Sequence, residues 1–259
     1  MVEYVYLIMT DDGPKKAGII IIGNEILSGK VVDANSSFLA KELRAIGVNL
    51  MRISVIPDDA GTIGKEILEF SETYDYVFTS GGVGPTHDDV TMEGIASGFH
   101  VGIVRHPELV RHLMNYCGGR TNAAVMKMAE VPEGAEIIDI GNAGFPLVSF
   151  RNVFIFPGIP QYLVKKFSAI KERFRCSPFY LRRLYLDAKE SDIAEILNTV
   201  VAENRDVAFG SYPIIDNPGY KVVVTAESRS RERVDLSVED LIKRLPKEMI
   251  VRVEKNDNQ

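Results

Sequence analysis

Four consecutive isoleucines, Ile19–Ile22, constrain the fold of this chain more than any other feature of its sequence. An apolar run without polar alternation is typical of a strand that is buried on both faces of a parallel sheet. The run is followed by Gly23-Asn24-Glu25, which places polar groups at the carboxyl end of the predicted strand. Since helices must cover both faces of such a sheet, the run predicts an α/β fold.

The following stretch alternates between helical and strand patterns joined by short links. The predicted elements are a helix over 35–46, a strand over 48–56, a helix whose apolar face holds Ile63, Ile67 and Phe70, and a strand over 76–79. Gly47 ends the first of these helices, and Pro57-Asp58-Asp59 breaks the strand. This β-α-β-α-β order predicts a doubly wound, mostly parallel sheet.

Residues 90–174 are predicted to complete this first domain with more helices and a hairpin. Helices are expected over 90–97, from Pro107 onwards, over 126–129 and up to about residue 174. The residues of the Pro107 helix that are expected to face inward are Leu109, Val110, Leu113 and Met114. Strands are expected over 136–140, 147–150 and 153–156, and a turn at Arg151-Asn152 predicts that the last two form a hairpin.

A domain boundary is predicted at Cys176-Ser177-Pro178, which gives a first domain over 1–176 and a second over 177–259. The second part reads strand, helix, strand, strand, helix, strand, which is the order of a small split βαβ domain of the α+β class. Ser191 is the expected N-cap of its first helix. The charge of this part is slightly acidic, so no basic surface is predicted.

Composition excludes several classes of protein. The formal net charge of −6 argues against a nucleic-acid partner, because proteins that bind the phosphate backbone normally carry a basic excess. No apolar run approaches the ~18 residues of a membrane span, so no membrane partner is expected. The N-terminus lacks a secretory signal and reads as an extra strand or a poorly ordered leader. Cys117 and Cys176 have no metal-ligand spacing and are expected to be free thiols. A cytoplasmic location is therefore expected.

The strongest signal for a ligand site is the segment from Thr79 to Asp89, which follows a buried strand and precedes a helix. Its Gly81, Gly82 and Gly84 allow a tight turn that presents backbone N–H groups to an anion. In open α/β sheets, ligands bind at the carboxyl ends of the strands, where this loop should lie. The residues expected to hold the phosphate or the rest of the ligand are Ser80, Gly81, Gly82, Gly84, Thr86, Asn142, Gly144, Pro157 and Gly158.

Carboxylates accompany this loop. Asp89 could be the N-cap of the next helix, or Asp88 and Asp89 could hold a divalent ion beside a bound phosphate. Asp58 and Asp59 present the same alternatives at another strand end. Together with Glu25 they exceed what turn formation needs, which favours a metal ion that assists attack on a phosphate. His87 is expected to be a solvated histidine.

The sequence resembles the molybdopterin-binding-like domain of molybdenum-cofactor biosynthesis proteins and of the competence/damage-inducible protein A (CinA) family. Five landmarks carry the resemblance in the same order along the chain. They are Gly23–Gly29 with Asp33–Ser36, Gly81–Thr91, Val131–Ala135, Phe156–Pro160 and Gly210–Pro213. The resemblance implies a three-layer α/β domain followed by a small α+β domain that is described in the family as KH-like.

The resemblance also implies chemistry. Asp58 and Asp89 match the two acidic positions implicated in catalysis, and Asp88, Asp89 and Glu25 are the expected metal ligands, with Mg²⁺, Mn²⁺, Co²⁺ or Ni²⁺ as cofactor. Relatives are associated with hydrolysis of ADP-ribose or FAD pyrophosphates, and they commonly self-associate. The amidase domain of many CinA proteins is not expected here. Asn24, where many relatives carry Asp, and the altered segment Asn142–Leu147 depart from the family pattern.

Three hypotheses follow. The first is a divalent-metal-dependent nucleotide pyrophosphatase that acts on ADP-ribose-like or FAD-like diphosphates. The second is binding or adenylylation of molybdopterin, which would then be the ligand. The third is a non-enzymatic module that binds a nucleotide or a partner. All three share a small phosphate-bearing nucleotide or pterin as the expected partner, with a homo-oligomer as the expected assembly.

Overall fold

The computed structural model describes residues 14–141 and 144–256. The chain divides into two compact units, Met1–Cys176 and Ser177–Gln259, at the position where the sequence places the domain boundary. Among the described residues, no helix combines the length and the apolar composition that a bilayer crossing requires.

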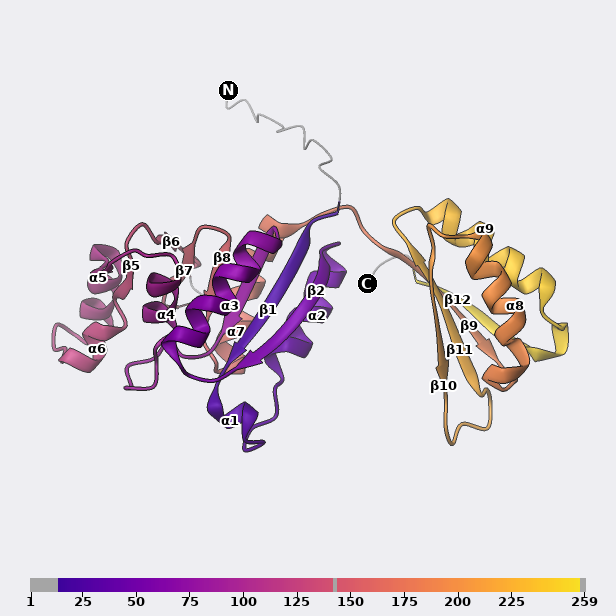
Figure 1. Cartoon of the computed structure of the whole chain (residues 1–259), viewed down its shortest axis with the longest axis horizontal. Coiled ribbons are helices and arrows are strands. Elements are labelled where there is room, and N and C mark those ends of the chain that lie inside the picture. Colours follow the sequence, from indigo (N-terminus) through magenta and orange to yellow (C-terminus); the bar gives the residue numbers. More distant parts are fainter. Residues whose placement is uncertain (1–13, 142–143, 257–259) are drawn as a thin grey trace, which may run out of the picture. The chain divides into compact units, whose positions relative to one another are not determined.

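The first unit is built on a six-stranded sheet with the order β2-β1-β3-β8-β7-β6 (Figure 1). Its strands are β1 (Lys16–Ile22), β2 (Asn49–Ile56), β3 (Tyr76–Ser80), β6 (Glu136–Ile138), β7 (Leu147–Phe150) and β8 (Val153–Phe156). The first four strands in this order are parallel, and β7 and β6 are antiparallel to their neighbours. The sheet is therefore mostly parallel, as predicted, with a β7–β8 hairpin at Arg151-Asn152.

The four isoleucines divide between two cores, one on each face of this sheet. Ile19 and Ile21 pack with helices α2 (Asn35–Ala45) and α7 (Pro160–Ile170). Ile20 and Ile22 pack with α3 (Ala60–Thr73), α4 (Thr91–Gly98) and α5 (Pro107–Tyr116). All four side chains are almost completely buried. The central strand is thus covered on both faces, which gives the expected three-layer fold.

Some local predictions for this unit were wrong. Met114 is exposed, although Leu109 and Leu113 of the same helix are buried as expected. The predicted helix over 126–129 is α6 (Ala123–Lys127), because Asn122 caps it by accepting a hydrogen bond from the Val125 amide. The sequence also missed three short elements: α1 (Asn24–Leu27), β4 (Ile103–Arg105) and β5 (Glu130–Pro132). The helix predicted to reach about residue 174 does so, with its last turn as the 3-10 helix η2 (Lys171–Phe174).

The second unit has a four-stranded sheet with the order β10-β11-β9-β12, in which all neighbours are antiparallel. Its elements are β9 (Tyr180–Leu186), α8 (Glu190–Glu203), β10 (Ala208–Pro213), β11 (Val222–Ser228), α9 (Arg231–Arg244), η3 (Lys247–Met249) and β12 (Ile250–Asn256). The order matches the predicted split βαβ unit. Ser191 is not the N-cap of α8, because the helix already begins at Glu190 and the Asp192 carboxylate accepts from the Lys189 amide.

Candidate functional site

The predicted site residues follow the carboxyl ends of four adjacent parallel strands. β2, β1, β3 and β8 lie side by side in the sheet, and the loops after them begin at Pro57, Gly23, Gly81 and Pro157. Parallel strands present their carboxyl ends at one edge of the sheet, where α/β proteins bind their ligands. The topology therefore gathers the glycine loop, the Asp58-Asp59 turn and the Pro157-Gly158 segment on one rim.

Gly81 lets the loop leave β3 in close contact with its neighbours. It has a φ of 113°, and a Cβ atom there would collide with the carbonyl oxygen of Ile22. Its amide donates to the carbonyl of Phe156 at 3.2 Å, and its own carbonyl accepts from the buried Thr91 hydroxyl at 2.9 Å. The Gly81 amide is thus engaged within the protein. Gly81 shapes the loop, and we do not assign it the role of a phosphate donor that the sequence suggested.

The amides available for a ligand follow directly after Gly81. Among the described residues, the backbone N–H groups of Gly82, Val83 and Gly84 have no intramolecular acceptor. A Cβ atom at Gly84 would lie 2.6 Å from a carboxylate oxygen of Asp89, so the glycine lets the Asp89 side chain approach the loop closely. Successive free amides of this kind form a concave site for an anion. The available donors of the loop are therefore residues 82–84.

The second half of the loop is closed by a contact between Asp89 and Thr86. The Asp89 carboxylate accepts from the Thr86 amide at 2.8 Å and also from the Thr86 hydroxyl. Val90, not Asp89, is the N-cap residue of α4, so the capping alternative for Asp89 was wrong. The Thr86 hydroxyl, together with the backbone amide of Asp88, lowers the pKa of the Asp88 carboxyl. The donors that the Asp89 carboxylate engages are therefore neutral groups.

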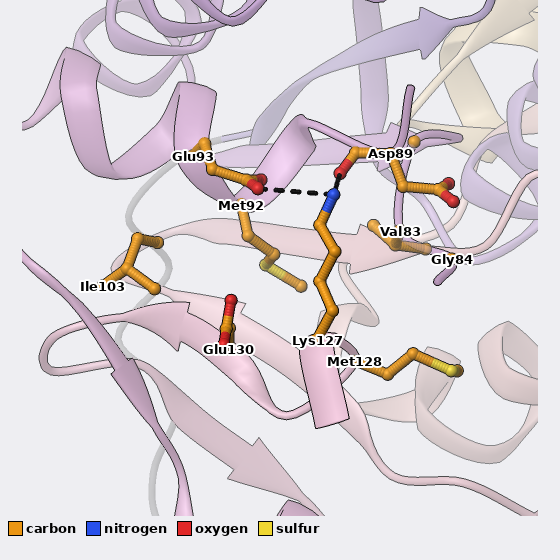
Figure 2. Close-up of a pocket in the computed structure, with 10 residues that line it drawn as sticks. Val83, Gly84, Asp89, Met92, Glu93, Ile103, Lys127, Met128 and Glu130 are labelled. Carbon is orange, nitrogen blue, oxygen red and sulfur yellow. Dashed lines mark hydrogen bonds and ion pairs between the residues drawn. The ribbon is translucent and has the colours of Figure 1, made fainter. Parts of the chain in front are cut away.

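Lys127 holds this loop from the opposite side, as Figure 2 shows. Its ammonium donates to the carbonyls of Thr86 at 3.0 Å and Asp89 at 2.8 Å, and it lies 3.5 Å from the Glu93 carboxylate. Lys127 lines a small hollow that opens to solvent, which we name the α6 hollow. Its lining includes Gly82, Gly84, Asp89, Met92, Lys127 and Glu130.

A second small hollow lies beside the start of α2, and we name it the α2 hollow. Its lining includes Glu25, Val32, Asp33, Asn35, Ser80 and Gly158. The buried Asn35 amide donates to the Ser80 hydroxyl at 2.9 Å and to the Gly158 carbonyl at 2.7 Å. Ser80 in turn donates to the Pro157 carbonyl at 3.2 Å. Asn35 therefore ties β3, the Pro157-Gly158 segment and α2 together.

The predicted carboxylates do not converge on one point. Asp58 accepts from the Asn24 amide at 2.7 Å, and Asp59 is the N-cap of α3 through the Thr62 amide and hydroxyl, both at 2.8 Å. Glu25 lines the α2 hollow, whereas Asp89 lines the α6 hollow. Within residues 14–141 and 144–256, no three His, Cys, Asp or Glu side chains come together in a group that could hold a metal ion. The expected convergence is absent because each carboxylate serves its own turn.

This donor set fits one type of metal site and does not fit another. Mg²⁺ and Mn²⁺ sites use hard oxygen donors, and Mg²⁺ in particular is commonly held by one or two carboxylates together with phosphate oxygens and water. Asp88 and Asp89, next to the free amides of the loop, offer this minimum. A metal cage made only of protein side chains would need more ligands than the described residues bring together. The residues therefore fit a metal ion that is shared with a phosphate.

Only part of the Asn142–Leu147 segment lies within the described residues. Asn142 lies outside the described residues, and Gly144 lines neither hollow. Lys166 of α7 fastens the rest of the segment, because its buried ammonium donates to the carbonyls of Phe145 at 2.6 Å and Pro146 at 2.7 Å. Burial lowers the pKa of Lys166 to about 8.

Sequence reasoning missed Asn35, Lys127 and Lys166. Asn35 stood inside the Asp33–Ser36 landmark, and its place at a helix start was a usable signal. No local pattern marked either lysine, since their acceptors are carbonyl groups far away in the chain.

Comparison with known proteins matches both units. The family described as "Probable molybdopterin binding domain" matches residues 18–175, and "FAD synthase, middle domain" matches residues 178–254. A protein of Archaeoglobus fulgidus is 39% identical over 222 residues, which cover 85% of this chain and 93% of that protein. A probable FAD synthase of Caenorhabditis elegans is 34% identical over 255 residues, which cover 88% of this chain and 49% of that protein.

A solved structure supports the resemblance to CinA. The crystal structure of the protein CinA, of unknown function, from Thermoplasma acidophilum superimposes with a TM-score of 0.58 at 29% identity. It covers 62% of this chain and all of the Thermoplasma chain. The first unit thus has the fold that the landmarks predicted, and the match over residues 18–175 spans more than half of the sequence. After this domain, residues 178–254 are similar to the FAD synthase middle domain, and the chain belongs to the molybdopterin-binding domain family.

Proposed function

We propose that this protein is a divalent-metal-dependent nucleotide pyrophosphatase that acts on ADP-ribose-like or FAD-like diphosphates. The observation that carries the proposal is the row of free amides at Gly82, Val83 and Gly84 next to the carboxylates of Asp88 and Asp89. An anion-binding loop attracts a phosphate group, whereas a neighbouring pair of charged carboxylates repels it. A diphosphate with a divalent cation satisfies both at once.

In this proposal the chain's own residues bind and orient the diphosphate. The three amides hold phosphate oxygens, and the closed Thr86–Asp89 turn fixes the Asp89 carboxylate beside the loop. Asp88 and Asp89 would hold the metal ion, which when bound supplies a Lewis acid for the phosphoryl group and a more acidic water. Asp58, which follows β2, is a further acidic residue to which we assign a role in catalysis. Lys127 keeps the loop in position through its two carbonyl acceptors.

Two small hollows that open to solvent lie next to the loop or to the strand before it, and we propose that they mark where the ligand's other parts leave the loop. The α2 hollow and the α6 hollow are each lined partly by residues of the loop or of the strand before it. The sequence covers about half of the C. elegans FAD synthase, so the reaction of that whole enzyme is not carried over to this chain.

The test is release of AMP from ADP-ribose and from FAD, measured with Mg²⁺, Mn²⁺, Co²⁺ and Ni²⁺ in turn and with a chelator as control. We expect metal-dependent AMP formation that the chelator abolishes. Absence of AMP from both substrates with every metal would contradict the proposal. Binding of molybdopterin is the second candidate, favoured by the family match over residues 18–175, and its titration without diphosphate hydrolysis would then decide the function.

A further inference from the structure

The outer edge of β2 has no paired strand within the part of the chain that the structure describes. β2 stands at one end of the six-stranded sheet, and no strand among the described residues pairs with its outer side (Figure 1). An edge strand presents unpaired N–H and C=O groups along that side, which form a template for another strand.

The exposed side chains of β2 are apolar. Met51, Ile53 and Val55 are 54%, 45% and 37% exposed. Ile53 and Val55 occupy alternate positions in the regular part of the strand, so they lie on the same face. Ile53 and Val55 neighbour Ile19 and Ile21 of β1, which belong to the core shared with α2 and α7. The apolar layer of that core therefore continues onto β2, where it is exposed.

The one charged side chain of β2 faces the opposite side of the sheet. Arg52 pairs with Glu66 at 3.1 Å and with Glu69 at 2.7 Å, both on α3, and its guanidinium lies over the Phe70 ring. Charged residues and proline usually protect an edge strand from pairing. Arg52 is engaged elsewhere, so this protection is missing on the apolar face.

The other described edge strands are poorer partners for β2 than β2 itself. β12 carries the charged residues Arg252 and Glu254, β10 ends in Pro213, and β6 has only three residues. The β2 strand of a second copy instead presents its own Ile53 and Val55 to Ile53 and Val55 of the first copy. This self-complementarity is what a two-fold interface requires.

An irregularity in β2 sets the register of such pairing. Leu50 pairs with Ala17 and Arg52 with Gly18, so Met51 has no opposite residue in β1. The regular segment is therefore Arg52–Ile56, whose centre is Ser54. A two-fold axis at Ser54 places Ser54 opposite its equivalent, Ile53 opposite Val55 and Arg52 opposite Ile56. No like charges oppose one another, and the two apolar pairs face each other directly.

We propose that two copies of this chain associate through antiparallel pairing of their β2 strands about Ser54, which joins the two sheets into one. The surface is small, so we expect a weak dimer with a dissociation constant on the order of 10 µM. The proposal is independent of the proposed activity, because its readouts are mass and cross-linking.

The first experiment measures the mass of the full chain by sedimentation equilibrium over a range of concentrations. We expect a reversible dimer, and Ile53→Lys should weaken it at least 10-fold by placing a charge in the apolar row. Val253→Lys is the matched control, since Val253 is 38% exposed on the edge strand β12, and it should leave the dimer unchanged. Circular dichroism checks that both variants are folded. A wild-type chain that stays monomeric, a dimer that survives Ile53→Lys, or one that Val253→Lys dissociates would overturn the proposal.

The second experiment tests the register by disulfide formation in a Cys117→Ser/Cys176→Ser background. Ser54→Cys should cross-link to itself, because directly opposed residues of an antiparallel pair bring their Cβ atoms within disulfide reach. Arg52→Cys should not, since its predicted opposite residue is Ile56. A mixture of the Ile53→Cys and Val55→Cys variants should cross-link more than either alone. Efficient cross-linking of Arg52→Cys without cross-linking of Ser54→Cys would show that the proposed pairing is wrong.

Discussion

The two units of this protein hold their carboxylates in different ways. At the strand ends of the first unit, Asp58 and Asp89 accept hydrogen bonds from backbone amides and a hydroxyl. In the second unit, Asp206 receives two hydrogen bonds from the Arg233 guanidinium, and Glu203 receives two from that of Arg244. The pKa of Asp206 is lowered by Arg233, whereas that of Asp88 is lowered first by the Thr86 hydroxyl.

This difference matters because neutral donors keep a carboxylate charged without cancelling its charge. An ion pair instead supplies the opposite charge within the protein. The strand ends of the first unit therefore retain negative charge that a divalent cation can neutralise. Asp206 and Glu203 of the second unit each pair with a guanidinium of the same unit, as in a structural network.

The largest effect is expected for Asp89→Asn. Loss of this charge should lower metal-dependent AMP release by about 1000-fold, the upper range for removing one electrostatic contact from an active site. The matched variant Asp206→Asn changes the same group in the second unit and should leave the rate unchanged. Initial rates for the two variants, with thermal unfolding to confirm folding, provide the measurement. Equal rates for both would remove the functional distinction between the two regions.

Gly81→Ala should have the next largest effect, on stability. A Cβ atom would collide with the Ile22 carbonyl, at a φ that disfavours any side chain, so we expect a loss of about 3 kcal/mol in the free energy of unfolding. Gly29 also has a positive φ, of 69°, but a Cβ atom there would meet nothing within 4 Å. Gly29→Ala should therefore cost only about 1 kcal/mol. Urea unfolding of both variants measures the difference, and similar losses would contradict the close contact at Gly81.

Asp235→Asn tests the network of the second unit. Arg182 is almost completely buried, and its guanidinium donates to the Asp235 carboxylate at 2.7 Å. Removal of that charge should destabilise the protein by about 2 kcal/mol, less than for a fully buried pair because Asp235 is partly exposed. Urea unfolding should show this loss while AMP release per folded molecule is retained. A stable variant with reduced turnover would reverse the roles that we assign to the two units.

The smallest effect concerns the buried cation of the first unit, Lys166, whose partners are carbonyls and whose pKa is lowered to about 8. Between pH 8 and the ordinary lysine pKa of about 10.4, the unfolded chain holds this proton and the folded chain releases it. The contribution of Lys166 to the free energy of unfolding therefore rises with pH in this range. Relative to Lys166→Met, wild type should gain about 1 kcal/mol between pH 7 and pH 9. A difference in unfolding free energy that does not change with pH would show that Lys166 keeps its ordinary pKa.

Local sequence patterns predicted much of the fold and the location of the site. The Ile19–Ile22 run specified a central strand because the burial of every residue in it leaves no polar face. The glycines after β3 and the acidic turn after β2 marked strand ends, and parallel topology placed these ends on one rim. The order of elements after residue 177 predicted the second unit for the same reason, since apolar periodicity reports burial along each segment.

The tertiary structure alone decided which partner each polar group found. Asn35 bonds to Gly158, 123 residues away, and Lys127 bonds to Asp89, 38 residues away. It also showed that Asp89 bonds to Thr86 instead of capping α4, and that Glu25 and Asp89 line separate hollows. Burial patterns repeat along a helix or a strand and can be read locally. A hydrogen bond or an ion pair instead depends on a few tenths of an ångström between segments that only packing brings together.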